Sequence, residues 1–258
     1  MQISSQISGV YQDLLSSTIL KFNPVEIKAT CHQCNEKKYK PSLKCCTYHP
    51  FLPNYIVGKI LFDDSMGAGI VRKKIQKRQF CLPIGVVPSV RYQVEFHKNK
   101  DKNFGRNADW LCPFYSKDDQ NCHIWKDRGS VCTSFYCQSS YGKKGIQFWK
   151  TLENYLSFSE MICMEEALIN ADFSPRQVSD LLGYINRSSG TKSELLRNSI
   201  DQKKWKQLWN GYDQDIEAFY IKCFRTVEKM PRSEFRLMGG DQLKSFENAV
   251  IDAIGEIK

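Results

Sequence analysis

The second half of the chain carries apolar residues at helical spacing. From Gly145 onward they recur every three or four positions, which predicts one long helix; they are Phe148, Leu152, Tyr155, Leu156, Met161 and Met164. A Ser-Pro pair at 174–175 marks the start of a shorter helix. Further helical segments are predicted at 193–212, 213–230 and 241–257. We therefore expect residues 145–258 to form a helical domain.

The first half is less regular. An N-terminal helix is predicted with one apolar face, made of Ile3, Ile7, Tyr11, Leu14 and Leu15. Residues 49–62 read as a turn that leads into a helix or strand, residues 64–80 as a loop that becomes strongly basic, residues 80–96 as short extended pieces and residues 97–109 as a polar loop. We expect an α+β, mainly α fold. Residues 1–144 would form an irregular cysteine-rich metal-binding region, with the helical domain of residues 145–258 packed on it.

Eight of the 11 cysteines fall into two groups of four. The first group is Cys31, Cys34, Cys45 and Cys46, and the second is Cys112, Cys122, Cys132 and Cys137. Four thiolates complete a tetrahedral zinc site or hold one iron–sulfur cluster, so eight suit one or two metal centres. The spacing predicts that these eight cysteines bind metal, but it does not identify the metal. We take an iron–sulfur cluster as first choice and zinc as second.

The adjacent pair Cys45-Cys46 is a special case. In extended backbone neighbouring side chains point in opposite directions, so the two thiols would serve two sites, or one site and a position beside it. The number of metal centres, one or two, therefore stays open.

The expected compartment also favours metal over disulfides. No run of eighteen apolar residues could span a bilayer, and the N-terminus lacks the basic segment of a signal peptide. We expect a cytoplasmic protein without a membrane span. In a reducing cytoplasm disulfides are rare, and clustered cysteines more often bind metal.

The charge is unevenly divided along the chain. Residues 1–140 contain 20 Lys and Arg against 11 Asp and Glu, whereas residues 141–258 contain 17 of each. One interpretation is a nucleic-acid surface, because neutralisation of phosphates drives such binding. We favour local compensation of negative thiolates by basic neighbours such as Lys37, Lys38, Lys40 and Lys44. No aromatic-and-basic pattern of a nucleic-acid module is present, so we do not expect nucleic acid as a partner.

The remaining candidate residues receive simpler interpretations. Cys163 and Cys223 lie on apolar helix faces and are predicted to be core residues, and Cys81 is predicted to pack in the core or to be a spare ligand. The four histidines are interpreted as neighbours of ligands, for His32 and His123, or as surface and turn residues, for His49 and His97.

Two arginines and several aromatic residues accompany the second cysteine group. Arg106 and Arg128 would either donate hydrogen bonds toward the sulfurs or form ordinary salt bridges. A dry aromatic shell is expected from Trp110, Trp125, Phe135, Tyr136 and Trp149. No Ser-His-Asp or Cys-His order indicates a catalytic nucleophile, and the glycines at 67 and 69 indicate only a flexible loop.

The residues around the cysteines form motifs that agree together over about 31–156. They are Cys31-His-Gln-Cys34, Lys44-Cys45-Cys46-Thr47-Tyr48, Leu52–Asn54, Val57-Gly58, Phe104-Gly105-Arg106, Cys112-Pro-Phe, Cys122-His-Ile-Trp-Lys-Asp-Arg128-Gly-Ser-Val-Cys132, Phe135-Tyr-Cys137 and Phe148-Trp149. This set resembles the bacterial YkgJ-like cysteine-cluster proteins, a family of zinc- or iron-chelating domains. Two features depart from the usual pattern. Ten residues separate Cys34 from Cys45, and Gly129 stands where a proline commonly follows the arginine.

The resemblance implies metal chelation. Our first hypothesis is a cytoplasmic cysteine-cluster protein with a metal-binding or structural role. The second is a metal-dependent enzyme that modifies a protein or a small molecule. A related group, the flagellin lysine methylases, looks like an enzyme class built around a similar cysteine cluster. A substrate or partner would then bind between the second cysteine group and the helix that starts near Gly145, within reach of Arg128, Tyr141 and Trp149. The sequence specifies neither substrate, partner nor oligomeric state.

Overall fold

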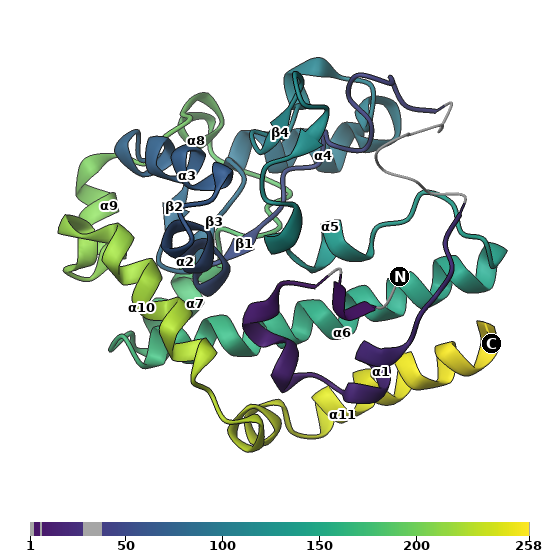
Figure 1. The fold of residues 1–258 in the computed structure, drawn as a ribbon. Helices are drawn as coiled ribbons and strands as arrows, with labels where there is room; N and C mark the ends of the chain where they lie inside the picture. Colours follow the sequence, from purple (N-terminus) through teal and green to yellow (C-terminus); the bar gives the residue numbers. More distant parts are fainter. Residues whose placement is uncertain (1–2, 6, 28–37, 258) are drawn as a thin grey trace.

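The longest helix, α6 (Gly142–Ile169), is the central support of the fold. In the computed structural model, which describes residues 3–5, 7–27 and 38–257, α11 (Arg232–Ile257) packs along one side of this helix (Figure 1). The short helix α5 (Ser130–Ser134) packs on another side. The apolar spacing that predicts a long helix from Gly145 is confirmed, with a start three residues earlier.

The remaining helices surround this support. The other α-helices are α1 (Ser17–Lys21), α2 (Asn54–Phe62), α3 (Met66–Gln76), α4 (Val90–Asn103), α7 (Pro175–Leu182), α8 (Lys192–Leu196), α9 (Gln202–Trp209) and α10 (Ile216–Glu228). The 3₁₀ helices are η1 (Ile3–Ser5), η2 (Gly9–Leu14), η3 (Ala108–Trp110), η4 (Trp125–Asp127) and η5 (Tyr212–Gln214). In the described part of the chain no helix is long and apolar enough to cross a membrane.

Two small antiparallel sheets complete the fold. The first has the order β1 (Leu52–Pro53), β3 (Gly85–Val86), β2 (Cys81–Leu82), and the second pairs β4 (Tyr115–Ser116) with β5 (Asn121–Cys122). Helices hold 61% of the described residues and strands 4%, so the predicted α+β, mainly α class is confirmed.

The two halves of the chain share one hydrophobic core. The core cluster has members from both predicted regions, 1–144 and 145–258, and α2 packs closely on α10. Gly58 permits this contact, because a Cβ there would lie 1.9 Å from the Tyr220 carbonyl oxygen. The division of the chain at residue 144 stays a prediction.

Several predictions for the first half were wrong about the type of element. The N-terminal apolar face is buried as expected, but its residues lie in or beside the 3₁₀ helices η1 and η2 rather than in one helix, and α1 begins after them. The predicted loop at 64–80 contains α3, whose buried residues are Gly67, Ala68 and Val71. Close packing is the reason: a Cβ on Gly67 would lie 2.4 Å from Ile124. Tertiary contact therefore overrides the low helix propensity of glycine.

Extended structure was predicted for 80–96, but the strands there end at Val86. The helix α4 begins at Val90 and also takes up most of the predicted polar loop 97–109. Ser89 starts α4 as a cap, since its hydroxyl accepts the Tyr92 amide at 3.2 Å. The predicted helix at 193–212 is divided into α8 and α9. The predicted start of the last helix, Asp241, follows directly on Gly240, whose non-helical backbone interrupts α11.

A buried carboxylate connects α6 to α5. Glu160 of α6 is 4% exposed and accepts hydrogen bonds from the Ser130 amide (2.8 Å), the Ser130 hydroxyl (2.7 Å) and the Tyr11 hydroxyl (3.1 Å). Burial raises the pKa of Glu160 to about 7, although these hydrogen bonds act in the opposite direction. The carboxyl group thus fixes the beginning of α5, the helix that carries Cys132.

This group makes stability depend on pH. Because the folded pKa lies above the unfolded value of 4.5, the folded state holds the proton more tightly, so the free energy of unfolding falls as pH rises from 4.5 to about 7. The shift corresponds to roughly 3 kcal/mol. We expect Glu160→Gln, which stays neutral and keeps an acceptor for Ser130, to lose less stability than the native protein when the pH is raised from about 5 to about 8, a range that covers most of this window.

Urea denaturation at the two pH values measures the effect. The exposed Glu256→Gln on α11 is the control and should follow the native protein. A Glu160→Gln variant with the native pH dependence would show that the carboxyl group does not carry this effect.

Candidate functional site

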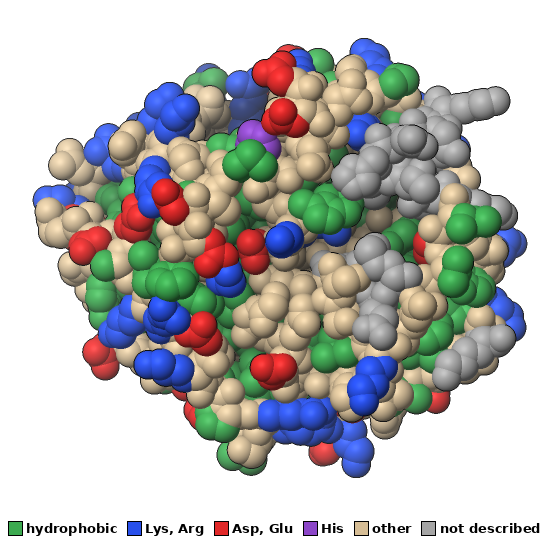
Figure 2. All heavy atoms as spheres, viewed as in Figure 1, with side chains coloured by type: hydrophobic (Ala, Val, Ile, Leu, Met, Phe, Trp, Pro, Cys, Tyr) green, Lys and Arg blue, Asp and Glu red, His purple; other side chains and the backbone are tan. Residues whose placement is uncertain are grey.

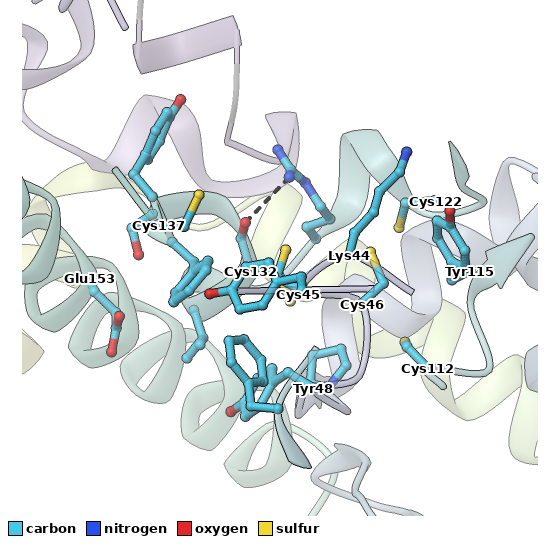
Figure 3. Close-up of a pocket in the computed structure, with 18 of the residues that line it drawn as sticks. Lys44, Cys45, Cys46, Tyr48, Cys112, Tyr115, Cys122, Cys132, Cys137 and Glu153 are labelled. Atoms are coloured by element: carbon cyan, nitrogen blue, oxygen red, sulfur yellow. Dashed lines mark hydrogen bonds between the residues drawn. The ribbon is translucent and has the colours of Figure 1, made fainter. Parts of the chain in front are cut away.

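Six of the eight predicted ligands line a single cavity of about 810 Å³. They are Cys45, Cys46, Cys112, Cys122, Cys132 and Cys137, all labelled in Figure 3. They come from the segment before β1, the segment after η3, β5, α5 and the stretch that follows α5. The other two predicted ligands, Cys31 and Cys34, lie outside the described residues.

Backbone contacts bring the cysteine-bearing segments together. The Cys112 amide donates to the Cys46 carbonyl at 2.8 Å, which joins the second cysteine group to the first. The pairing of Tyr115 with Cys122 in the β4–β5 hairpin closes the loop between Cys112 and Cys122. Cys132 is positioned through the bond between Glu160 and the start of α5. Residues far apart in sequence therefore face one space.

The thiols in this cavity influence one another electrostatically. Burial raises the pKa of Cys112 to about 12 and that of Cys132 well above its ordinary value, and in Cys132 neighbouring Cys112, Cys122 and Cys45 contribute to the rise. The largest cause at Cys45 is its hydrogen bond with Cys46, which also raises the pKa. In these surroundings the cysteine side chains favour the neutral thiol form unless a positive charge stabilises the thiolate.

Arg128 supplies positive charge at this place. Its side chain is 9% exposed, donates to the carbonyls of Trp125 (3.1 Å) and Cys132 (3.3 Å), and stacks on the Trp125 ring at 3.6 Å. No carboxylate of the described residues forms a salt bridge with it. The positive charge of Arg128 lowers the pKa of Cys45, Cys122 and Cys132. Burial and, at Cys45, the bond with Cys46 raise these pKa values more strongly. Among the described residues, Arg128 thus forms neither the salt bridge nor a hydrogen bond to a cysteine sulfur, and it donates to carbonyls instead.

Lys44 is a second buried cation beside the cysteines. It is 5% exposed, its Nζ donates to the Gln120 carbonyl at 2.9 Å, and the same atom lies 5.7 Å from the centre of the Tyr115 ring. Its backbone is left-handed, with φ of 53°, which costs about 1 kcal/mol or more for such a residue. Within the described chain no carboxylate pairs with Lys44 either.

Aromatic side chains form much of the rest of the wall. Tyr136 stacks on Trp149 with ring centres 4.0 Å apart, and Phe135 meets Phe104 edge to face at 5.6 Å. The Trp149 indole donates to Glu26 at 2.7 Å, and Glu26 also accepts the Ser139 hydroxyl at 2.6 Å. The chain before the first cysteine group is thereby fastened to the beginning of α6. Of the five aromatic residues expected around the second group, Trp125, Phe135, Tyr136 and Trp149 line the cavity, whereas Trp110 packs against Tyr92 and Phe96 outside its lining.

Some predicted residues lie elsewhere. Tyr141, expected near a ligand, instead accepts the Val25 amide at 3.0 Å and is not part of the cavity wall. The exposed Arg106 lines the cavity and donates to the Lys38 carbonyl at 2.7 Å. His123 lies 3.3 Å from Asp119, outside the cavity lining.

His49, expected at a surface or turn, is half-buried. Its ring stacks on Tyr92 with centres 3.9 Å apart, and Nε2 lies 3.1 Å from the carbonyls of Trp110 and Leu111. Burial lowers the pKa of His49 to about 4, so the ring is neutral at neutral pH. The three cysteines expected in the core, Cys81, Cys163 and Cys223, are buried there.

The sequence interpretation missed two parts of the wall. Phe96 and Lys100 enter the cavity from α4, one helical turn apart, and Glu153 enters from α6. The spacing of Ile146, Lys150 and Glu153 is the signal that would have found the α6 face. The α4 face was missed because this part of the chain was predicted to be a polar loop and not a helix.

The cysteines are suitable metal ligands in kind and number, but their side chains are not arranged around a common point in this structure. Within residues 3–5, 7–27 and 38–257, no group of three or more His, Cys, Asp or Glu side chains is arranged to hold a metal ion. Thiols are nevertheless the donors that zinc and iron–sulfur clusters take, and Cys132 interacts electrostatically with Cys45, Cys112 and Cys122. Metal binding would require their sulfurs to turn toward a common point.

The surface seen in Figure 2 does not gather the basic excess into one patch. Basic and acidic side chains are interspersed over the coloured part of this face. Five of the 20 basic residues of the first half line the cavity, namely Lys38, Lys44, Lys100, Arg106 and Arg128.

Comparisons with protein-family models, with curated proteins and with solved structures found no match for this chain. The resemblance to the YkgJ-like proteins therefore rests on the cysteine motifs themselves.

Proposed function

We propose that this protein binds a metal centre through the cysteines of the cavity, with an iron–sulfur cluster as first choice and zinc as second. One observation carries the proposal: six cysteines from separate segments line one cavity together with two buried cations that have no carboxylate partner among the described residues. Chance burial of small apolar residues would not account for this convergence.

The charges support an anionic occupant. Burying an arginine or lysine without a counter-ion is costly, so Arg128 and Lys44 need negative charge close by. Cysteine thiolates around a metal provide it, since a centre with four thiolates keeps a negative net charge. This is the local compensation expected from the uneven charge of the sequence.

The size of the cavity favours a cluster over a single ion. A structural zinc ion is held directly by four ligands at about 2.0–2.3 Å and leaves little free space. The cavity of about 810 Å³ offers more room than that. We assign Cys132 and the three thiols that interact electrostatically with it, Cys45, Cys112 and Cys122, to such a centre.

Bound iron–sulfur would supply a redox-active or Lewis-acidic group, and the protein's residues would control its surroundings. Arg128 would stabilise the thiolates, Lys44 would balance their charge, and the aromatic wall would keep water away. A reducing compartment, the cytoplasm, is the setting in which these thiols would stay available.

A metal-dependent enzyme is the second candidate. The observation in its favour is that the cavity lies between the second cysteine group and α6, where Arg128 and Trp149 both line it. A purely structural centre would leave no such space. Modification of a protein or small molecule, as the resemblance to the flagellin lysine methylases implies, therefore stays a hypothesis beside metal binding.

The first test is metal content. Protein purified without oxygen should carry iron with a broad absorbance in the blue, or stoichiometric zinc without colour, because the cavity thiols would be occupied. Elemental analysis and a visible spectrum measure this directly. Folded protein free of both metals would contradict the proposal.

Single cysteine substitutions test the ligand assignment. We expect Cys112→Ser, Cys122→Ser and Cys132→Ser each to lower metal content and thermal stability, because metal binding contributes to folding energy. Cys163→Ser and Cys223→Ser are matched controls, since both thiols are buried in the core away from the cavity. Metal content per folded protein is the measurement, and equal loss in both groups would show that the ligands are misassigned.

Arg128 provides a test of charge balance. Arg128→Met keeps the aliphatic bulk but removes the charge, so it should weaken metal binding by about 10–100-fold in competition with a chelator. Arg128→Lys restores a cation and should recover part of the affinity. Far-ultraviolet circular dichroism checks that both variants fold. Equal affinities of the Met and Lys variants would show that the charge is not what matters.

A further inference from the structure

The cavity is larger than a metal centre requires. Pockets that bury organic ligands of drug size measure roughly 300–1,000 Å³, and this cavity measures about 810 Å³. The cysteines contribute one part of its wall, and side chains of α4, α6 and the chain after α5 contribute another. The second part offers space beside the thiols.

That second part is apolar and aromatic. The stacked pair Tyr136 and Trp149 presents flat rings, and Phe135 packs against Phe104 next to it. Ile146 of α6 belongs to the same wall and is 41% exposed. Such a surface favours a flat or apolar body, because the ligand would cover rings and an exposed isoleucine side chain.

The charged side chains of the wall are mostly basic. Six Lys and Arg residues line the cavity against two acidic residues, Asp101 and Glu153, which gives an excess of four positive charges while the thiols are neutral. Glu153 is already paired with Lys150 at 2.5 Å. Lys100 and Arg106 form no salt bridge with a carboxylate of the described residues. A negative group is therefore attracted and a positive one repelled.

We propose that this cavity binds an apolar organic anion beside the cysteines. Its apolar body lies against Tyr136, Trp149 and Ile146, and its carboxylate, phosphate or sulfonate group meets the basic side chains of the wall. The inference rests on the proposed function only in that the metal centre and the anion share one cavity. It gives the ligand class that the second, enzymatic candidate would use.

A pair of fluorescent probes tests the ligand class. Anilinonaphthalene sulfonate is an aromatic anion, and phenyl-naphthylamine has the same aromatic body without the charge. We expect saturable binding of the sulfonate at one site per protein and binding of the uncharged probe that is weaker by about tenfold or more. Equal affinities for the two probes would overturn the proposal, as would failure of the sulfonate to bind.

Substitutions on α6 locate the site. Ile146→Glu places a carboxylate at the wall and should weaken sulfonate binding by about tenfold or more through like-charge repulsion, whereas Ile146→Lys should preserve it. Ile169→Glu is the matched control, because Ile169 is 55% exposed and lies at the far end of the same helix, roughly 35 Å away. Thermal melting followed by circular dichroism checks folding. An Ile146→Glu variant that binds like Ile169→Glu would overturn the location.

Metal analysis of the same samples separates this inference from the metal proposal. Sulfonate binding that is sensitive to Ile146→Glu in protein without iron or zinc would support the anion site and contradict the metal centre. Bound metal without sulfonate binding would support the metal centre and overturn the anion site.

Discussion

The Glu160 carboxylate holds the helix that carries Cys132 against the central helix α6. The amide and hydroxyl of Ser130 and the hydroxyl of Tyr11 all donate to it, so the N-terminal 3₁₀ turns, α5 and α6 meet at one buried group. Removing these donors would leave a carboxylate without partners in the interior, at a cost of several kcal/mol. The position of α5, and with it one wall of the cavity, depends on this contact.

A second constraint is electrostatic. Arg128 and Lys44 are buried beside thiols that favour their neutral form, and this arrangement leaves positive charge without an acidic counterpart among the described residues. Ordinary cores avoid that situation, whereas binding sites for negative groups require it. The same charges suit thiolates around a metal and an organic anion beside them, so the two proposals follow from one property of the cavity.

Sequence reasoning worked best where a single helix face decides the structure. The period of α6 and the start of α7 at Ser174-Pro175 are local signals, and both elements formed as predicted. It failed for α3 and α4, because Gly67 is placed in a helix by its contact with Ile124, and Ser89 was not recognised as a cap. The cysteine spacing indicated which thiols belong together, yet neither the partners of Arg128 nor the depth of the cavity follow from spacing, since both depend on contacts between distant segments.

The face that α6 turns toward α5 and the cavity is a single stripe. Ile146, Lys150, Glu153, Ser157 and Glu160 follow one another at intervals of three or four residues, and the Ser157 hydroxyl lies 2.8 Å from that of Ser130. Successive residues of an α-helix are rotated by about 100° around the helix axis. One inserted or deleted residue between 146 and 160 would therefore turn the cavity wall away from the group that anchors α5. A substitution on this stripe leaves the other residues facing the same way, whereas a change in the length of the helix there does not.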